Sequence, residues 1–175
     1  MTSDARVIDV PGVARFEISP HHCFACGTLN AHGMHLELHV ERGRSWVELT
    51  YEQRFQGWDG IAHGGILATI LDEVMAWALV GEDNWGVTAR LSIDFKRPVT
   101  VGQLIRADGW ITRSRRRVVD TEARVIDVAT GDVLATGAGV YMGADESRKR
   151  ELRARYGWRE LIEDATPETV DVAGR

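Results

Sequence analysis

The sequence predicts an α+β domain in which an antiparallel sheet wraps around one long central helix. The first observation is the apolar segment at residues 64–80, which has the length of a helix and stops near Gly81. The second is the order along the chain: two strand-like segments precede this helix and four follow it. Because the helix is apolar on most of its circumference, we expect the sheet to bury it nearly all round.

The two strands before the helix are expected to form a hairpin. Apolar and polar side chains alternate over residues 34–41, as in a half-buried strand. The apolar members of this alternation are Met34, Leu36, Leu38 and Val40. The turn "RGR" then leads into "SWVELTYE" at residues 45–52, the second strand of the hairpin.

The four strands after the helix are separated by turn-forming sequences. The predicted strands cover residues 87–97, 102–113, 117–128 and 132–142. Pro98 and "VGQ" separate the first two, "RSRRR" the next two, and "ATGD" the last two, of which "ATGD" is the clearest turn signal. The sheet therefore contains five to six strands.

The chain length of 175 residues suits one domain with two appendages. We expect an N-terminal arm at residues 1–20, the main domain at 21–143, and a charged helical tail at 144–175. An apolar fraction of 44% allows a sizeable core. The formal net charge of −5 disfavours nucleic acid as the main partner.

Several classes of location are disfavoured by the same composition. Asp72 and Glu73 interrupt the longest apolar run, so no segment is expected to span a membrane. The N-terminus has early acids and no apolar signal core. Only two cysteines occur, Cys23 and Cys26, which favours a reducing compartment over a disulfide framework. The predicted location is the cytoplasm.

Two adjacent carboxylates lie in the middle of the apolar helix. A buried, unpaired carboxylate costs several kcal/mol unless it protonates or finds partners. Helical spacing places Asp72 on a stripe of small residues, whereas Glu73 lies about 100° further round, beside bulky side chains. The small stripe comprises Gly65, Ala68, Thr69, Asp72 and Ala76. Asp72 can reach solvent or cap a backbone group, but this stripe also leaves room for a ligand or another chain.

The start of the helix offers a second functional feature. Gly64 and Gly65 expose backbone N–H groups at the positive end of the helix dipole, a natural site for an oxyanion. Gly64 and Asp72 are eight residues apart, roughly 12 Å along the axis. One carbonyl cannot easily touch both groups. If both act on one substrate, two copies of the helix must meet at a dimer interface.

Three segments resemble hotdog-fold acyl-CoA thioesterases of the phenylacetic-acid-degradation (PaaI) type. They are "CFACGTLNAHGMHLELH", "FQGWDGIAHGGILATILDE" and "TARLSIDFKRPV", and the resemblance spans roughly residues 23–142. It implies a curved antiparallel sheet around a central helix, which agrees with the element order. Met34 departs from the usual leucine.

The resemblance also implies roles for individual residues. The family's catalytic carboxylate corresponds to Asp72, and its carbonyl-polarising glycine to Gly64, beside Gly65. Thr88 matches a hydroxyl residue that positions water or substrate. Gln56 matches a polar residue that lines the pocket, and His63 is expected to support the loop rather than act as a base.

Coenzyme A requires phosphate contacts, which related enzymes place on the strands after the helix. The resemblance puts Asp94, Arg106 and Arg117 at CoA-contacting positions, and the run "RSRRR" would suit a 3′-phosphate. An ordinary solvated hairpin is the alternative for that run. Alternation also predicts one polar strand face. Its members are Thr88, Arg90, Ser92, Asp94 and Lys96.

The predicted function is hydrolysis of an acyl-CoA thioester without a cofactor, by a homodimer or a dimer of dimers. Asp72 would act as general base or as nucleophile. The alternative is a non-catalytic protein that binds acyl-CoA, although such a protein does not need Asp72. An enoyl-CoA hydratase is disfavoured because no histidine follows His63.

The sequence does not distinguish aromatic, short and medium acyl groups as substrates. Four tryptophans are candidates for the acyl pocket or the core. They are Trp46, Trp58, Trp77 and Trp85.

Cysteines and histidines cluster near the N-terminus. His21, His22, Cys23, Cys26, His32 and His35 lie within fifteen residues. Two thiolates and two imidazoles can hold zinc, but this spacing matches no recognised finger. Packing is therefore the favoured explanation for the cysteine pair, and no metal is expected.

Overall fold

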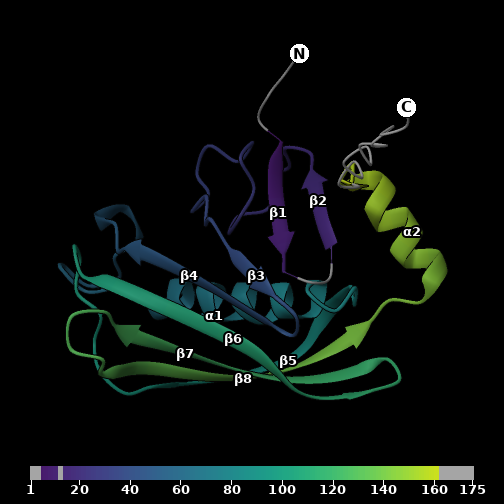
Figure 1. Cartoon of the computed structure of the whole chain (residues 1–175). Coiled ribbons are helices and arrows are strands. Elements are labelled where there is room, and N and C mark those ends of the chain that lie inside the picture. The colour runs from purple at the N-terminus through teal and green to yellow at the C-terminus, as the bar shows by residue number, and fades with distance from the viewer. Residues whose placement is uncertain (1–4, 12–13, 162–175) are drawn as a thin grey trace, which may run out of the picture.

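A six-stranded antiparallel sheet curves around the central helix α1 (Gly64–Val80) in the computed structural model, which describes residues 5–11 and 14–161 (Figure 1). The strand order is β3-β4-β6-β7-β8-β5, and each neighbouring pair is antiparallel. The strands are β3 (His39–Glu41), β4 (Arg44–Thr50), β5 (Gly86–Phe95), β6 (Leu104–Arg115), β7 (Val118–Asp127) and β8 (Val133–Gly143). This is the predicted fold class, and the α+β prediction is confirmed.

The predicted helix at residues 64–80 is confirmed residue for residue. Its sheet-facing side is fully buried, and Ile70, Leu71, Val74 and Met75 have no exposed surface. Burial nearly all round is wrong for the single chain, however. The side of α1 that carries Gly65, Ala68 and Asp72 is partly exposed, because neither sheet covers it.

The four strands after the helix are confirmed, with ends that differ by one or two residues. The strand predicted at 34–41 is too long, since only β3 at its end is paired. His35 adopts a positive φ of 53°, which interrupts the extended backbone. The alternation nevertheless predicted correctly which side chains are buried. The apolar residues of this segment are buried, and Glu37, His39 and Glu41 are exposed.

A second, smaller layer covers the C-terminal half of α1. Within the predicted arm, β1 (Arg6–Val10) and β2 (Ala14–Ile18) form a hairpin, which β9 (Arg159–Glu160) extends to three strands. Their buried side chains pack with Trp77 and Val80 of the helix. The short helices η1 (Gln53–Phe55) and α2 (Glu146–Arg155) complete the described elements. Residues 1–4 and 12–13 of the arm and 162–175 of the tail lie outside the described residues.

The edge strand β5 contains a bulge that changes which side its residues face. Thr88 pairs with Tyr141 and Arg90 with Val140, so Ala89 is the extra residue. The bulge turns Thr88 towards α1, while Arg90, Ser92 and Asp94 keep the alternation expected beyond it. The prediction of one polar face from Thr88 to Lys96 is therefore wrong at Thr88.

No helix in the described part of the chain has the length and apolar character to cross a membrane.

Candidate active site

The carboxylate of Asp72 is held by two hydroxyl groups. Thr88 Oγ1 donates a hydrogen bond of 2.8 Å to Asp72 Oδ1, and Tyr141 OH donates one of 2.6 Å to the same oxygen. Tyr141 OH also lies 3.0 Å from the main-chain oxygen of Asp72. Both side-chain bonds end on Oδ1, so among the described residues Oδ2 has no donor. That oxygen is available to a water molecule or a substrate carbon.

Sequence reasoning brought Asp72 and Thr88 together but missed Tyr141. Burial and the nearby charge of Asp72 raise the pKa of Tyr141, so the phenol stays protonated and donates. Tyr141 lies opposite Thr88 in the ladder between β5 and β8. The missing signal was the register of this pair, which the alternation within one strand does not provide.

The start of α1 leaves one backbone donor unused. His63 caps the helix: its Nδ1 accepts from Gly65 N–H at 2.9 Å, and its carbonyl accepts from Ile66 and Leu67 N–H. Within residues 5–11 and 14–161, Gly64 N–H has no acceptor. This cap points to a supporting role for His63.

The loop before the helix is braced by Gln56. Its Oε1 accepts from Gly60 N–H at 3.1 Å, and its backbone forms a bridge with Ala62. In the single chain the Gln56 side chain therefore stabilises the loop that presents Gly64 and Gly65. Any contact with substrate stays a prediction.

The predicted CoA residues are not brought together in one chain. Asp94 lies on β5 and pairs with Lys96 at 3.5 Å, whereas Arg117 lies in the turn between β6 and β7 and donates from Nε to Gly143 O at 2.8 Å. Arg106 pairs with Ile126, far along the same hairpin from Arg117.

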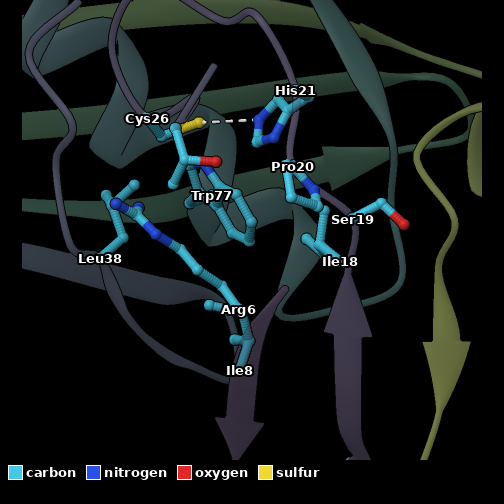
Figure 2. A pocket seen from close by; sticks show the side chains of 10 residues that line it. Arg6, Ile8, Ile18, Ser19, Pro20, His21, Cys26, Leu38 and Trp77 are labelled. Carbon is cyan, nitrogen blue, oxygen red and sulfur yellow. Dashed lines mark hydrogen bonds between the residues drawn. The ribbon is translucent and has the colours of Figure 1, made fainter. Parts of the chain in front are cut away.

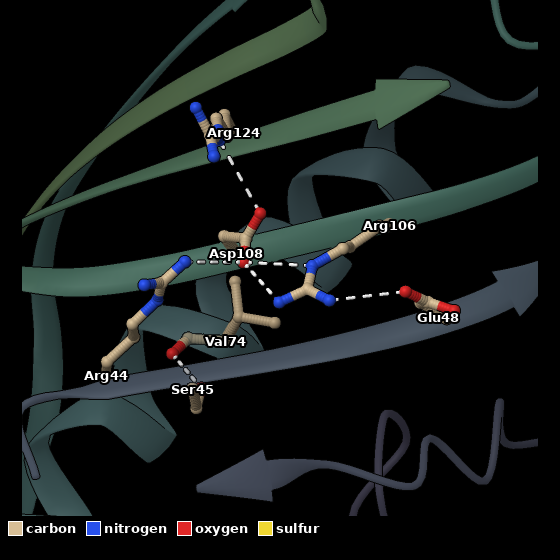
Figure 3. A network of polar contacts seen from close by, with 7 residues as sticks. All are labelled: Arg44, Ser45, Glu48, Val74, Arg106, Asp108 and Arg124. Atoms are coloured by element: carbon tan, nitrogen blue, oxygen red, sulfur yellow. Dashed lines mark hydrogen bonds and ion pairs between the residues drawn. The ribbon is translucent and has the colours of Figure 1, made fainter. Parts of the chain in front are cut away.

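Arg106 belongs instead to a network around Asp108 (Figure 3). The Asp108 side chain is only 1% exposed, and Arg44, Arg106 and Arg124 surround it within 3.5 Å. Burial acts to raise its pKa, but hydrogen bonds from Arg106 and Arg44 and their positive charges outweigh burial and lower it. Arg106 also contacts Glu48 at 3.2 Å, so two carboxylates occupy its guanidinium.

Glu73 has a different environment from its neighbour Asp72. It is buried against the loop at residues 21–27, where Trp77 Nε1 donates to its Oε1 at 2.9 Å and Cys23 Sγ lies 3.9 Å from Oε2. Burial, followed by the charge of Cys23, raises the pKa of Glu73 to about 7. A hydrogen bond from Cys26 lowers the pKa of Cys23 to about 5, and the same contact raises that of Cys26.

An aromatic cleft of about 270 Å³ opens one helical turn beyond Asp72. Ala76, on the same small stripe, lies on its floor, and Trp77 and Trp85 line it as predicted candidates. Ile18 of β2 and the neighbouring residues Tyr156 and Trp158 also line it. Trp58 is 87% exposed and Trp46 stacks on His39, so neither belongs to this cleft.

The central helix presents a carboxylate braced by two hydroxyl groups, and its start leaves an amide unused roughly 12 Å away along the axis. The fold is the hotdog fold, and the protein is a thioester hydrolase. Comparisons with known proteins agree with this class. Residues 59–133 match the family model of the thioesterase superfamily. A putative esterase of Saccharolobus solfataricus is 30% identical over 104 residues, which cover 58% of this chain and 73% of that protein. The chain belongs to the thioesterase superfamily.

Two further relatives extend the comparison. Human acyl-coenzyme A thioesterase 13 is 25% identical over 97 residues, which cover 54% of this chain and 69% of that protein. The crystal structure of another thioesterase superfamily protein superposes with a TM-score of 0.63 and 26% identity, over 69% of this chain and 60% of that chain. The family-model match begins after β4 and ends at the first residue of β8, so Tyr141 and the smaller layer lie outside it.

Proposed function

We propose that the protein hydrolyses acyl-CoA thioesters at a site that two subunits share. Asp72 of one subunit activates the attacking water or attacks directly, and Gly64 N–H of the other stabilises the oxyanion. One observation carries this proposal. Two hydroxyl groups hold the Asp72 carboxylate, the Gly64 N–H is unused, and within one chain these two groups lie too far apart to contact the same carbonyl. The name of the human relative supports acyl-CoA as the substrate.

The open edge of the large sheet supports a shared site. Among the described residues, β5 pairs only with β8, and most of its residues are exposed, including Val87 at 70% and Phe95 at 54%. The Phe95 ring packs beside Gly64, and Thr88 contacts Asp72. If two β5 edges pair antiparallel about an axis near Leu91 and Ser92, Phe95 of one subunit falls opposite Thr88 of the other. That pairing would bring Gly64 of one subunit towards Asp72 of its partner.

Two chemical routes lead from the thioester to the free acid and CoA. In the first, Asp72 takes a proton from water, the oxygen attacks the carbonyl carbon, the C–S bond breaks, and the proton passes to the CoA thiolate. In the second, an Asp72 oxygen attacks and expels the thiolate, which takes up a proton, and water then cleaves the resulting anhydride. Single-turnover hydrolysis in ¹⁸O-water separates them: the label enters the Asp72 carboxylate only by the second route.

We propose that the acyl group binds in the aromatic cleft. It continues the stripe of small residues from Asp72 through Ala76, so an acyl chain whose carbonyl lies at Asp72 reaches the indoles of Trp77 and Trp85. The size and apolar lining of the cleft favour aromatic or medium-length acyl groups over acetyl. Trp85→Ala should raise KM about tenfold for a phenylacetyl thioester and leave that for acetyl-CoA within twofold. Trp58→Ala, which removes an exposed indole, is the matched control.

Arg117 remains the proposed phosphate contact. It lines a hollow with Arg116 and Lys149 at the turn between β6 and β7. Asp94 and Arg106 would then contact CoA only from other subunits, in a homodimer or a dimer of dimers. We propose the cytoplasm as the location of the protein. Arg117→Glu should raise KM for acyl-CoA, whereas the same charge reversal at exposed Arg150 should not. An unchanged KM in the Arg117 variant would remove that residue from the site.

Two substitutions at Gly64 test the shared site. Gly64→Pro removes the N–H at a position where helices accept proline, and His63 already has the extended backbone that precedes proline. Gly64→Ala is the matched control, because it crowds Phe95 similarly but keeps the N–H. We expect Gly64→Pro to lose at least a hundredfold in kcat and Gly64→Ala to lose less than tenfold.

Mixing the two variant subunits then tests whether Asp72 and Gly64 of one site come from different subunits. Gly64→Pro and Asp72→Asn subunits, inactive separately, should recover roughly a quarter of wild-type activity after mixing and reassembly, since half of the dimers are mixed and each contains one intact site. No recovery, with mixed dimers present, would overturn the shared site. Binding of acyl-CoA without release of thiol by the wild-type protein would instead favour the non-catalytic alternative.

A further inference from the structure

A second cluster of reactive side chains lies about 100° round the helix from Asp72. It joins Cys23 and Cys26 of the N-terminal loop to Glu73 of α1, fifty residues later in the sequence. The two sulfurs and a Glu73 oxygen all lie within 4.8 Å of one another. His21 adds a fourth donor, because its Nε2 lies 3.4 Å from Cys26 Sγ, as Figure 2 shows.

We propose that Cys23, Cys26, Glu73 and His21 form a binding site for one Zn²⁺ ion. Zinc in proteins is four-coordinate, with bonds of about 2.3 Å to sulfur and 2.0–2.2 Å to nitrogen or oxygen. A tetrahedron with these bonds places neighbouring donors roughly 3.5–3.8 Å apart. The measured separations are 3.9 Å between Cys23 Sγ and Glu73 Oε2 and 3.4 Å between Cys26 Sγ and His21 Nε2. His21 is not among the residues whose donor atoms all lie within 4.8 Å of one another, so its ring must move towards Cys23 and Glu73 to complete the set.

The loop is built so that both sulfurs approach the helix together. Gly27 N–H donates to Cys23 O at 3.0 Å, and Leu29 N–H donates to His21 O at 3.0 Å. A Cβ at Gly27 would lie 2.3 Å from His21 O and 2.4 Å from Cys23 N, so this tight turn admits only glycine.

The carboxylate is oriented in the manner of a metal ligand. Trp77 Nε1 fixes Glu73 Oε1 at 2.9 Å, and the other oxygen, Oε2, is the one that faces Cys23. Across residues 5–11 and 14–161, no lysine or arginine forms an ion pair with Glu73. A divalent cation would neutralise a buried carboxylate and two thiolates in the same small volume.

Sequence spacing alone did not favour this site, because it offered only cysteines and histidines from one short segment. The third ligand comes from the central helix, which the fold brings to the loop. Two soft sulfur donors, one imidazole and one carboxylate select zinc over calcium or magnesium. The ion would tie the loop at 21–27, one wall of the aromatic cleft, to the helix that presents Asp72.

Metal analysis of the full-length chain tests the proposal. Protein made without a histidine tag in zinc-supplemented medium should contain about one zinc ion per chain by mass spectrometry, and Cys23→Ser and Cys26→Ser should contain less than a tenth of that. His32→Ala, which removes an exposed histidine nearby outside the cluster, should retain full zinc content. Substitution of Co²⁺ into the wild-type protein should give a near-ultraviolet sulfur-to-cobalt charge-transfer band that the cysteine variants lack.

Glu73→Gln and His21→Ala test the other two ligands without removing a thiol. Each should weaken zinc binding at least tenfold in competition with a chromophoric chelator, while circular dichroism confirms that the chain is folded. Zinc below about 0.1 per chain in the wild type, with both thiols equally reactive before and after chelator treatment, would overturn the proposal. A disulfide between Cys23 and Cys26 in freshly purified protein would also overturn it.

Discussion

Asp72 and Glu73 are neighbours in the sequence but lie in opposite environments. Asp72 faces the half-open side of α1, where two hydroxyl groups donate to one of its oxygens and leave the other available. Glu73 faces the loop at residues 21–27, where an indole and a thiol contact its two oxygens. A helix turns about 100° per residue, which is enough to separate a carboxylate suited to chemistry from one suited to holding a loop in place. Substitutions at each carboxylate and at its hydrogen-bond partners test this division.

Replacing the half-open carboxylate should have the largest effect. Asp72→Asn keeps the shape and can still accept from Thr88 and Tyr141, but it is neither a base nor a nucleophile, so kcat should fall about a thousandfold. The melting temperature should change by less than about 2 °C. Thiol release from a panel of acyl-CoA substrates measures the first quantity, and circular dichroism the second. Turnover near the wild-type value would refute the role of Asp72.

Replacing the buried carboxylate should give the reverse pattern. Glu73→Ala leaves the Trp77 N–H without its acceptor and opens a cavity beside the cysteines, so the free energy of unfolding should fall by about 2–3 kcal/mol. The value of kcat should stay within about tenfold of the wild type. Urea unfolding followed by tryptophan fluorescence gives the stability. A thousandfold loss of kcat in a folded Glu73→Ala protein would remove the distinction between the two carboxylates.

Asp108 provides a third carboxylate whose role is purely structural. Its pKa is lowered in the folded protein, so its stabilising contribution is fully present above its unfolded pKa of about 3.9 and is lost as the pH falls through the lower folded value. Asp108→Asn should therefore destabilise the protein by about 2 kcal/mol at pH 7. The difference from the wild type should shrink below about pH 4. Urea unfolding at both pH values checks this, and a difference that does not depend on pH would contradict it.

Removing the hydroxyl donors should have the smallest effect. Tyr141→Phe and Thr88→Val each delete one hydrogen bond to Asp72 while keeping the shape of the side chain, and each should lower kcat about tenfold with little change in KM. The double variant should lose less than the product of the single losses, because both donors serve one oxygen. Steady-state kinetics on the three variants measures this coupling. Fully multiplicative losses would mean that the two hydroxyls act independently.

Much of the fold could be predicted from the sequence because its signals are local. The helix at 64–80 and the four strands after it follow from apolar periodicity and turn residues, and Asp72 and Thr88 were both identified in advance. Glu73 was recognised only as the less favoured carboxylate. Its contact with Cys23 joins positions fifty residues apart, and such a contact leaves no periodic trace in the sequence. The bulge at Ala89 and the positive φ at His35 were missed for the related reason that single-residue irregularities do not alter the surrounding pattern.

The smaller layer joins the two ends of the described chain, since β2 near the start pairs with β9 near the finish. This layer and Tyr156 beside it wall the aromatic cleft, yet both lie outside the segment that matches the family model. If this cleft receives the acyl group, part of the acyl preference is encoded outside the segment that matches the family model. Exchange of the terminal stretches between relatives should carry substrate range with it while the hydrolytic centre stays in place.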